Sequence, residues 1–178
     1  MKGIIFTTFT KMIEEKFGLE MLDELIVNTK PKSEGIYIST ATYEDAELIN
    51  MVVYLSKKID VPVEDLVRTF GHFTFQVLSK SFPHFLENKT FKDFILSVHD
   101  VVHVEVKKLY PEAELPTFIY KNIKDNSLTM KYISNRNLPT LAEGLIQGAA
   151  DYYNKNVKIT LTECSEENNC YNIELSFD

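Results

Sequence analysis

Two histidines in the middle of the chain have a spacing that could hold a metal. His99 and His103 lie four residues apart, so on a helix they would face one side, one turn apart. Neutral imidazole is a good iron or zinc ligand, and one histidine on a buried helix can hold haem from one side. Taken alone, His103 is more often a core histidine with its hydrogen bonds made within the protein. The pair of His99 and His103 could also form a non-haem metal site. No HExxH motif supports a protease.

A second group of polar side chains follows within Tyr132-Ile133-Ser134-Asn135-Arg136. If this segment is extended, its period of two places Tyr132, Ser134 and Arg136 on one face. Two hydroxyls and a guanidinium would then point at one acceptor, and arginine suits bidentate carboxylate binding. Beside a haem-ligating histidine, the two propionates are the natural acceptors. The alternative is the polar face of an exposed strand.

The elements that must position these side chains begin with helices. Apolar residues recur at helical spacing between glycines and prolines, which predicts helices over residues 4–17, 19–27, 43–59 and 62–82. Thr90 and Asp93 form a capping pattern. The helix that they open carries His103 and is expected to run without a break to about Pro111.

The last third of the chain changes to strand periodicity. Residues 117–120 and 128–134 predict a hairpin, residues 141–153 a helix, and alternation over 157–161 and 171–177 a second hairpin. The fold class is therefore α+β, with a helical N-terminal part followed by an antiparallel sheet with a packed helix. We expect one domain over residues 1–178, with a helical part at about 1–62 and the His103 helix and sheet at about 63–178.

Composition excludes several classes of protein. The 178 residues are 44% hydrophobic and 25% charged, as in ordinary globular domains. A net charge of −7 argues against a nucleic-acid partner. No signal peptide and no apolar run long enough for membrane insertion is visible, which predicts a cytoplasmic protein. P-loop, Rossmann and Ser-His-Asp signatures are missing as well, so the sequence does not support an enzyme.

Taken together, these motifs resemble the haem-nitric oxide/oxygen-binding (H-NOX) domains, which are related to the haem domain of soluble guanylate cyclase. The resemblance covers essentially the whole chain. It rests on the Met1-Lys2-Gly3 start, His103 followed by Leu109-Tyr110-Pro111, the Pro116 segment, the Y-x-S-x-R element, and Gly144-Leu145-Ile146-Gln147-Gly148.

The resemblance implies an H-NOX fold with haem b, ferrous iron protoporphyrin IX, buried between the helical part and the sheet. It implies that His103 is the proximal iron ligand. Tyr132, Ser134 and Arg136 would bind the propionates by the same resemblance. Ile5 and Pro116 match positions at which the family presses on the porphyrin and distorts it.

The resemblance also locates the distal gas pocket. Family members that hold oxygen place a tyrosine where this chain has Leu141, and Phe9, Leu78 and Leu145 are the expected neighbours. Bound oxygen depends on a distal donor far more than nitric oxide does. An apolar pocket should therefore favour nitric oxide, although the same side chains could simply fill the core, and Tyr152 could reach the pocket.

These expectations combine into a stand-alone nitric oxide sensor that signals by release of His103, with carbon monoxide as a further gas ligand. The family suggests a histidine kinase or a cyclic-dinucleotide enzyme as the partner in trans. An oxygen-binding haem protein of the same fold is the first alternative. A non-haem metal or interaction module that uses His99 and His103 is the second.

The two cysteines exclude a disulfide framework. The alternation that turns Tyr171 inward predicts that Cys170 points outward. With two thiols and no histidine in the tail, a zinc site at Cys164 and Cys170 is disfavoured, and reduced thiols are expected. A reversible disulfide would require suitable geometry.

Overall fold

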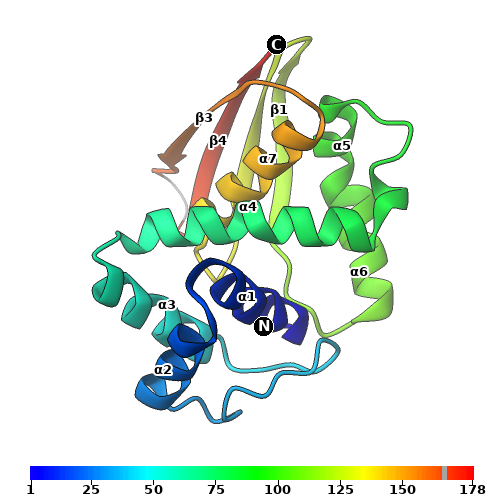
Figure 1. Cartoon of the computed structure of the whole chain (residues 1–178). Helices are drawn as coiled ribbons and strands as arrows, with labels where there is room; N and C mark the ends of the chain where they lie inside the picture. The colour runs from blue at the N-terminus through cyan, green and yellow to red at the C-terminus, as the bar shows by residue number, and fades with distance from the viewer. Residues whose placement is uncertain (166–167) are drawn as a thin grey trace.

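The computed structural model describes residues 1–165 and 168–178, and it combines a helical part with a four-stranded sheet (Figure 1). The first four helices are α1 (Gly3–Phe17), α2 (Leu19–Thr29), α3 (Asp45–Ile59) and α4 (Val63–Ser81). Their bounds confirm the four predicted helices to within two residues. Gly18 separates α1 from α2 with a φ of 86°, a conformation that glycine adopts without steric cost.

The segment around His103 is helical but not one continuous α-helix. Thr90 and Asp93 form the predicted capping box, with the Asp93 amide donating to the Thr90 hydroxyl at 3.2 Å. After α4 the chain forms η1 (Pro83–Phe85), α5 (Phe91–Ser97), the π-helical turn η2 (Val98–Val102) and α6 (His103–Leu109). The prediction of an unbroken helix is therefore wrong at η2, directly before His103.

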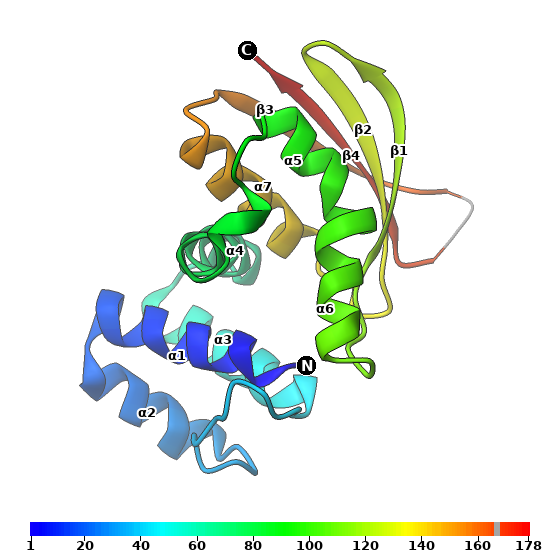
Figure 2. The same ribbon diagram turned by 90° about the vertical axis from the view of Figure 1, so that its right-hand side faces the viewer.

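The sheet confirms the α+β prediction. Its strands are β1 (Thr117–Lys124), β2 (Ser127–Ile133), β3 (Val157–Glu163) and β4 (Cys170–Phe177). They pair antiparallel in the order β1-β2-β4-β3. Figure 2 shows α5 and α7 (Pro139–Tyr152) on the same face of this sheet. Among the described helices, none has the length and apolarity needed to cross a membrane.

The buried side chains form two hydrophobic clusters. The helical cluster is built from α1 to α4, and the sheet cluster joins α5 and α7 to the strands. Helix α4 serves both, because Phe73 packs in the helical cluster and Phe75 in the sheet cluster. Helix α7 does the same through Leu141 and Leu145. The pair α4 and α7 therefore spans the junction of the two clusters.

Glycines bring α4 and α7 into very close contact. A Cβ atom added at Gly144 would collide with the backbone carbonyl oxygen of Arg68 and lie 2.9 Å from the amide nitrogen of His72. One at Gly71 would collide with the carbonyl oxygen of Leu141. Only residues without a side chain permit this separation of the helix axes.

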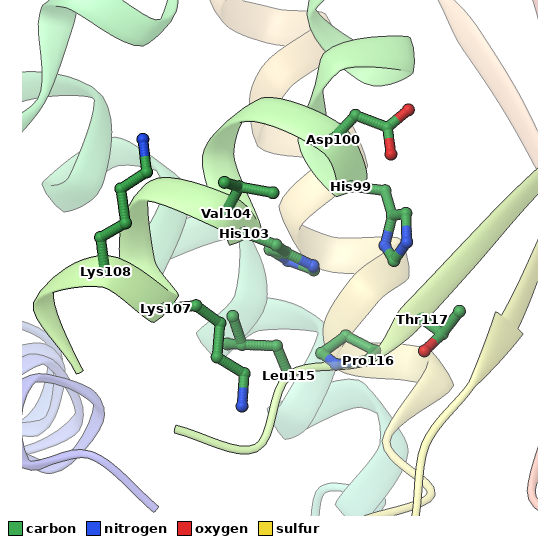
Figure 3. A pocket seen from close by; sticks show the side chains of 9 residues that line it. All are labelled: His99, Asp100, His103, Val104, Lys107, Lys108, Leu115, Pro116 and Thr117. Carbon is green, nitrogen blue, oxygen red and sulfur yellow. The ribbon is translucent and has the colours of Figure 1, made fainter. Parts of the chain in front are cut away.

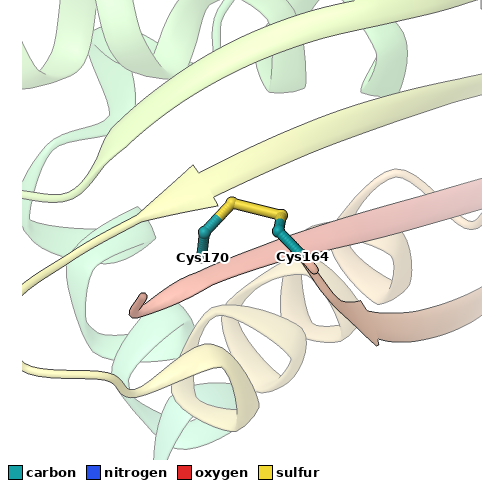
Figure 4. The surroundings of a disulfide bond; sticks show 2 residues. All are labelled: Cys164 and Cys170. Carbon is teal, nitrogen blue, oxygen red and sulfur yellow. A yellow bond between two sulfur atoms is a disulfide. The ribbon is translucent and has the colours of Figure 1, made fainter. Parts of the chain in front are cut away.

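The cysteines correct two predictions. Cys164 and Cys170 form a disulfide at the end of the β3–β4 hairpin (Figure 4), so they are not reduced thiols. Cys170 is fully buried rather than exposed. The Cys164 amide donates to the Cys170 carbonyl at 2.9 Å, and their Cα atoms lie 5.3 Å apart, within the usual range for a disulfide. The hairpin thus supplies the geometry that sequence alternation alone does not reveal.

Candidate functional site

His103 is the first residue of α6, and its imidazole is directed toward β1. Its ring centroid lies 5.6 Å from that of Phe118, a buried residue of β1. The Nδ1 atom is buried and has no hydrogen-bond partner among the described residues. Burial is the main cause that lowers the pKa of His103 to about 4; the neighbouring His99 adds to this effect, and the backbone carbonyl of Pro116 opposes it. The imidazole is therefore neutral near pH 7, as a metal ligand must be.

A cavity of about 450 Å³ opens beside His103. Figure 3 shows the His99 and His103 rings on the side of the helix that faces Pro116. The volume falls in the range of small-molecule sites. The lining residues are His99, Asp100, His103, Val104, Lys107, Lys108, Leu115, Pro116 and Thr117.

His103 does not belong to a cluster of metal ligands. Within residues 1–165 and 168–178, no group of three or more His, Cys, Asp or Glu side chains could hold a metal ion. The His99 and His103 ring centroids lie 6.2 Å apart. A single neutral imidazole suits a metal whose other ligands come from an organic group such as a porphyrin, and it argues against the non-haem alternative.

The Y-x-S-x-R element is not one extended strand, contrary to the assumption behind its predicted geometry. Strand β2 ends at Ile133, and the Asn137 amide donates to the Ser134 carbonyl at 3.0 Å, closing a turn. Asn137 has a φ of 50°, a left-handed conformation that asparagine tolerates. Tyr132, Ser134 and Arg136 therefore do not share one strand face.

The two hydroxyls nevertheless keep their protons available. Tyr132 accepts a hydrogen bond from the Leu138 amide at 3.1 Å, and the Ser134 hydroxyl accepts from the Arg136 amide at 3.3 Å. Within the described part of the chain, neither hydroxyl donates to a protein acceptor in these contacts. A hydroxyl that accepts from an amide can still donate one proton to a carboxylate.

Arg136 joins three parts of the fold. Its Nε donates to a carboxylate oxygen of Asp45 in the first turn of α3 at 2.6 Å. Its Nη2 lies 3.2 Å from the Glu114 carboxylate, and Nη1 donates to the Glu114 carbonyl. Burial raises the pKa of Asp45, but hydrogen bonds from the N-terminal amino group and Arg136 outweigh it and lower the pKa overall. Sequence reasoning missed Asp45 and Glu114, since no local pattern links residues so far apart.

The predicted distal residues lie on α1, α4 and α7. Phe9 is buried against Phe70 of α4, with ring centroids 5.3 Å apart, and Ile5 is partly buried one turn earlier. Leu78 on α4, like Leu141 and Leu145 on α7, is partly buried. These residues therefore belong to the elements that meet at the junction of the two clusters.

Sequence reasoning also missed Thr74. It lies on α4 one turn before Leu78, is 2% exposed, and its hydroxyl has no hydrogen-bond partner among the described residues. The available signal was a threonine one helical turn before Leu78, which the sequence predicted to line the distal pocket. Tyr152, by contrast, is half exposed at the end of α7, with its ring against Phe75 and Tyr153.

Comparison with known proteins identifies the family. The Haem-NO-binding family model matches residues 2–161. The chain belongs to the H-NOX family. H-NOX domains bind haem, and they act as gas-sensing modules. A comparison with curated protein sequences gives no match.

Solved H-NOX structures have the same fold. The Fe(II) unliganded H-NOX protein from K. algicida is 36% identical, with a TM-score of 0.92 over 100% of this chain and 97% of that chain. An H-NOX protein from S. oneidensis in the Fe(II)NO state is 29% identical, with a TM-score of 0.91 over 100% and 99%. The H-NOX domain from Shewanella oneidensis in the Fe(II)CO state is 29% identical, with a TM-score of 0.88 over 100% and 99%.

The residues of this chain fit haem. The His103 imidazole is partly buried, neutral and directed into the cavity. Tyr132 and Ser134 can donate to carboxylates, whereas the Arg136 guanidinium at the end of the same element already contacts the carboxylates of Asp45 and Glu114. This set matches an iron centre that carries two anionic groups at its edge.

Proposed function

We propose that this chain is a haem-based sensor of nitric oxide, without enzymatic activity, that signals to a partner protein through release of His103. The observation that carries the proposal is the neutral imidazole of His103, which lines the cavity and belongs to no cluster of metal-ligating side chains among the described residues. The protein would work in the cytoplasm, with carbon monoxide as a second gas ligand.

Haem supplies a ferrous iron at which a diatomic gas can bind. In this proposal His103 holds the iron from the side of α6, and Tyr132, Ser134 and Arg136 hold the propionates. Pro116 lines the cavity beside His103, which supports a role in pressing on the porphyrin. Ile5, partly buried on α1, would press from the helical part.

Gas selectivity would depend on the side chains of the distal pocket. Phe9, Leu78, Leu141 and Leu145 are apolar and offer no hydrogen-bond donor. Nitric oxide on ferrous iron needs a donor much less than oxygen does, so this pocket favours nitric oxide.

The contacts of Arg136 support a route from His103 to the helical part. Release of His103 would free α6 to move together with the loop that carries Glu114 and Pro116. Arg136 contacts Glu114 and also Asp45 on α3, so a movement of this loop would be transmitted to α3 through Arg136. A partner would then distinguish two arrangements of the same core. By family resemblance, the proposed partner is a histidine kinase or a cyclic-dinucleotide enzyme.

Absorption spectra of the ferrous protein with and without nitric oxide test this function. We expect a Soret band typical of an axial histidine, which changes to that of haem without histidine when nitric oxide is added. His103→Gly should lack the histidine-ligated spectrum even without the gas, and His84→Ala, at an exposed histidine of η1 that does not line the cavity, should behave as the wild type. A wild-type protein that binds no haem, or that keeps its histidine ligand under nitric oxide, would contradict the proposal.

Oxygen binding is a second candidate function, and Thr74 is the observation that favours it. Its buried hydroxyl has no partner among the described residues and could donate to a gas ligand. A ferrous–oxygen spectrum that is stable in air, and is lost in Thr74→Val, would support this alternative.

A further inference from the structure

The helix that carries His103 changes its hydrogen bonding just before this residue. The Val98 amide donates to the carbonyl of Ile95, three residues back, whereas the His103 amide donates to that of Val98, five residues back. A turn closed over five residues contains one residue more than an α-helical turn. The turn directly before His103 therefore contains one residue more than an α-helical turn, and it follows a tighter bond closed over three residues at Val98.

A side chain from the sheet binds the helix backbone at the point where its hydrogen bonding changes. The Tyr120 hydroxyl, on β1, donates to the Ile95 carbonyl at 2.7 Å. In a continuous α-helix the Ile95 carbonyl would accept from the His99 amide, and here it accepts from the Tyr120 hydroxyl of another element. Insertion of a side chain into this ladder is a known cause of helix distortion.

Two further observations show that Tyr120 is suited to this position. Burial is the main cause that raises the pKa of Tyr120 to about 12, which places the hydroxyl in the protein interior next to the helix. The same strand makes a second contact with the turn, because the Phe118 amide donates to Nδ1 of His99 at 3.4 Å. Strand β1 therefore holds the π turn at two points.

The extra residue determines where His103 points. At about 100° per residue, a continuous helix would place His103 about 80° around the axis from Ile95. One additional residue in the turn rotates it back by about 100°, to a direction between those of Ile95 and Phe91. Both residues are almost fully buried. The π turn thus explains why His103 faces Phe118 and the interior rather than the margin of the apolar stripe.

We propose that Tyr120 is a positioning residue for His103. The Tyr120 hydroxyl holds the π turn open and thereby directs the His103 imidazole toward its ligand. The ligand role of His103 rests on the proposed function, whereas the effect of Tyr120 on the backbone does not. Tyr120 itself touches neither the haem nor the gas in this proposal.

The test compares Tyr120→Phe with Tyr153→Phe. The control removes an equivalent hydrogen bond, because the Tyr153 hydroxyl donates to the Leu86 carbonyl at 3.0 Å and the pKa of Tyr153 is also raised to about 12, chiefly by burial. Two readouts apply to each variant. The first is the backbone conformation of residues 95–103 in a crystal structure of the whole protein, and the second is the iron–histidine stretching band of the ferrous protein by resonance Raman spectroscopy.

We expect Tyr120→Phe to close the turn into α-helix and to shift or abolish the iron–histidine band. Tyr153→Phe should change neither readout, even if it lowers stability to the same extent. Retention of both the π turn and the wild-type band in Tyr120→Phe would overturn the proposal. A wild-type protein without haem would refute the proposed function instead, and the crystal structures would still decide the role of Tyr120.

Deletion of Asp100 provides a rescue experiment. This exposed residue lies within the π turn, so its removal from Tyr120→Phe should leave a continuous helix with His103 facing inward again. Recovery of the wild-type band in the double variant would support the proposal. If Tyr120→Phe does not fold, recovery of folded, haem-binding protein by the deletion has the same meaning, and failure to recover overturns the proposal.

Discussion

Replacement of Gly144 by alanine should destabilise the protein, because α4 and α7 touch at this residue. The new Cβ would collide with the Arg68 carbonyl oxygen and lie 2.9 Å from the His72 nitrogen, and both atoms belong to the backbone of α4. Backbone atoms cannot rotate away, so the helices must separate by about 1.5 Å to reach normal contact distances.

The expected cost follows from two opposing effects. Overpacking costs about 1–3 kcal/mol, and the backbone contacts at Gly144 place it near the upper limit. Alanine regains about 1 kcal/mol because it favours helix more than glycine does. The free energy of unfolding should therefore fall by about 2 kcal/mol, which for a chain of this size lowers Tm by roughly 4–8 °C.

Urea unfolding of Gly144→Ala and Gly148→Ala measures this difference. A Cβ at Gly148 would meet the Cβ of Phe75 at 2.8 Å and the His72 carbonyl at 3.1 Å, a milder overlap that should cost less. Because α4 and α7 also carry proposed pocket residues, Gly144→Ala should also release haem faster to apomyoglobin. A Gly144→Ala protein as stable as the wild type, or less affected than Gly148→Ala, would refute the reasoning.

Three further predictions concern other contacts. Thr74→Val should raise the free energy of unfolding of the haem-free protein by about 1 kcal/mol in urea titrations. The reason is that a methyl group of similar size replaces a buried hydroxyl without a partner among the described residues. A loss of stability would show that the hydroxyl has a hydrogen-bond partner. The pKa of Asp45 is lowered in the folded state, so its pairing with Arg136 stabilises the protein above the ordinary aspartate pKa and is lost as pH falls through the lowered value. Asp45→Asn should therefore flatten the acid limb of a stability–pH curve, and an unchanged limb would contradict this. The Cys164–Cys170 disulfide joins residues six positions apart, and its reduction should lower the free energy of unfolding by about 2 kcal/mol. Thermal melts with and without reductant measure this difference, and a Cys164→Ser/Cys170→Ser variant should not respond to reductant.

The sequence by itself determined the elements and the family resemblance. Helix ends depend on neighbouring residues, so Gly18 and the Thr90–Asp93 capping box were predictable from local chemistry. Strand faces follow from alternation, which predicted both hairpins. The identities of the proposed haem ligands came from short motifs and from their order along the chain.

Only the tertiary structure decided how these elements act on one another. Arg136 meets Asp45 across 91 residues, and the Tyr120 hydroxyl meets the Ile95 carbonyl across 25. Periodicity assumes a constant number of residues per turn, so it could not anticipate a π turn beside which a side chain from another element binds the helix backbone. The direction of His103 depends on that turn. It is therefore set by the packing of the sheet against the helix, because local sequence alone would have continued the α-helix.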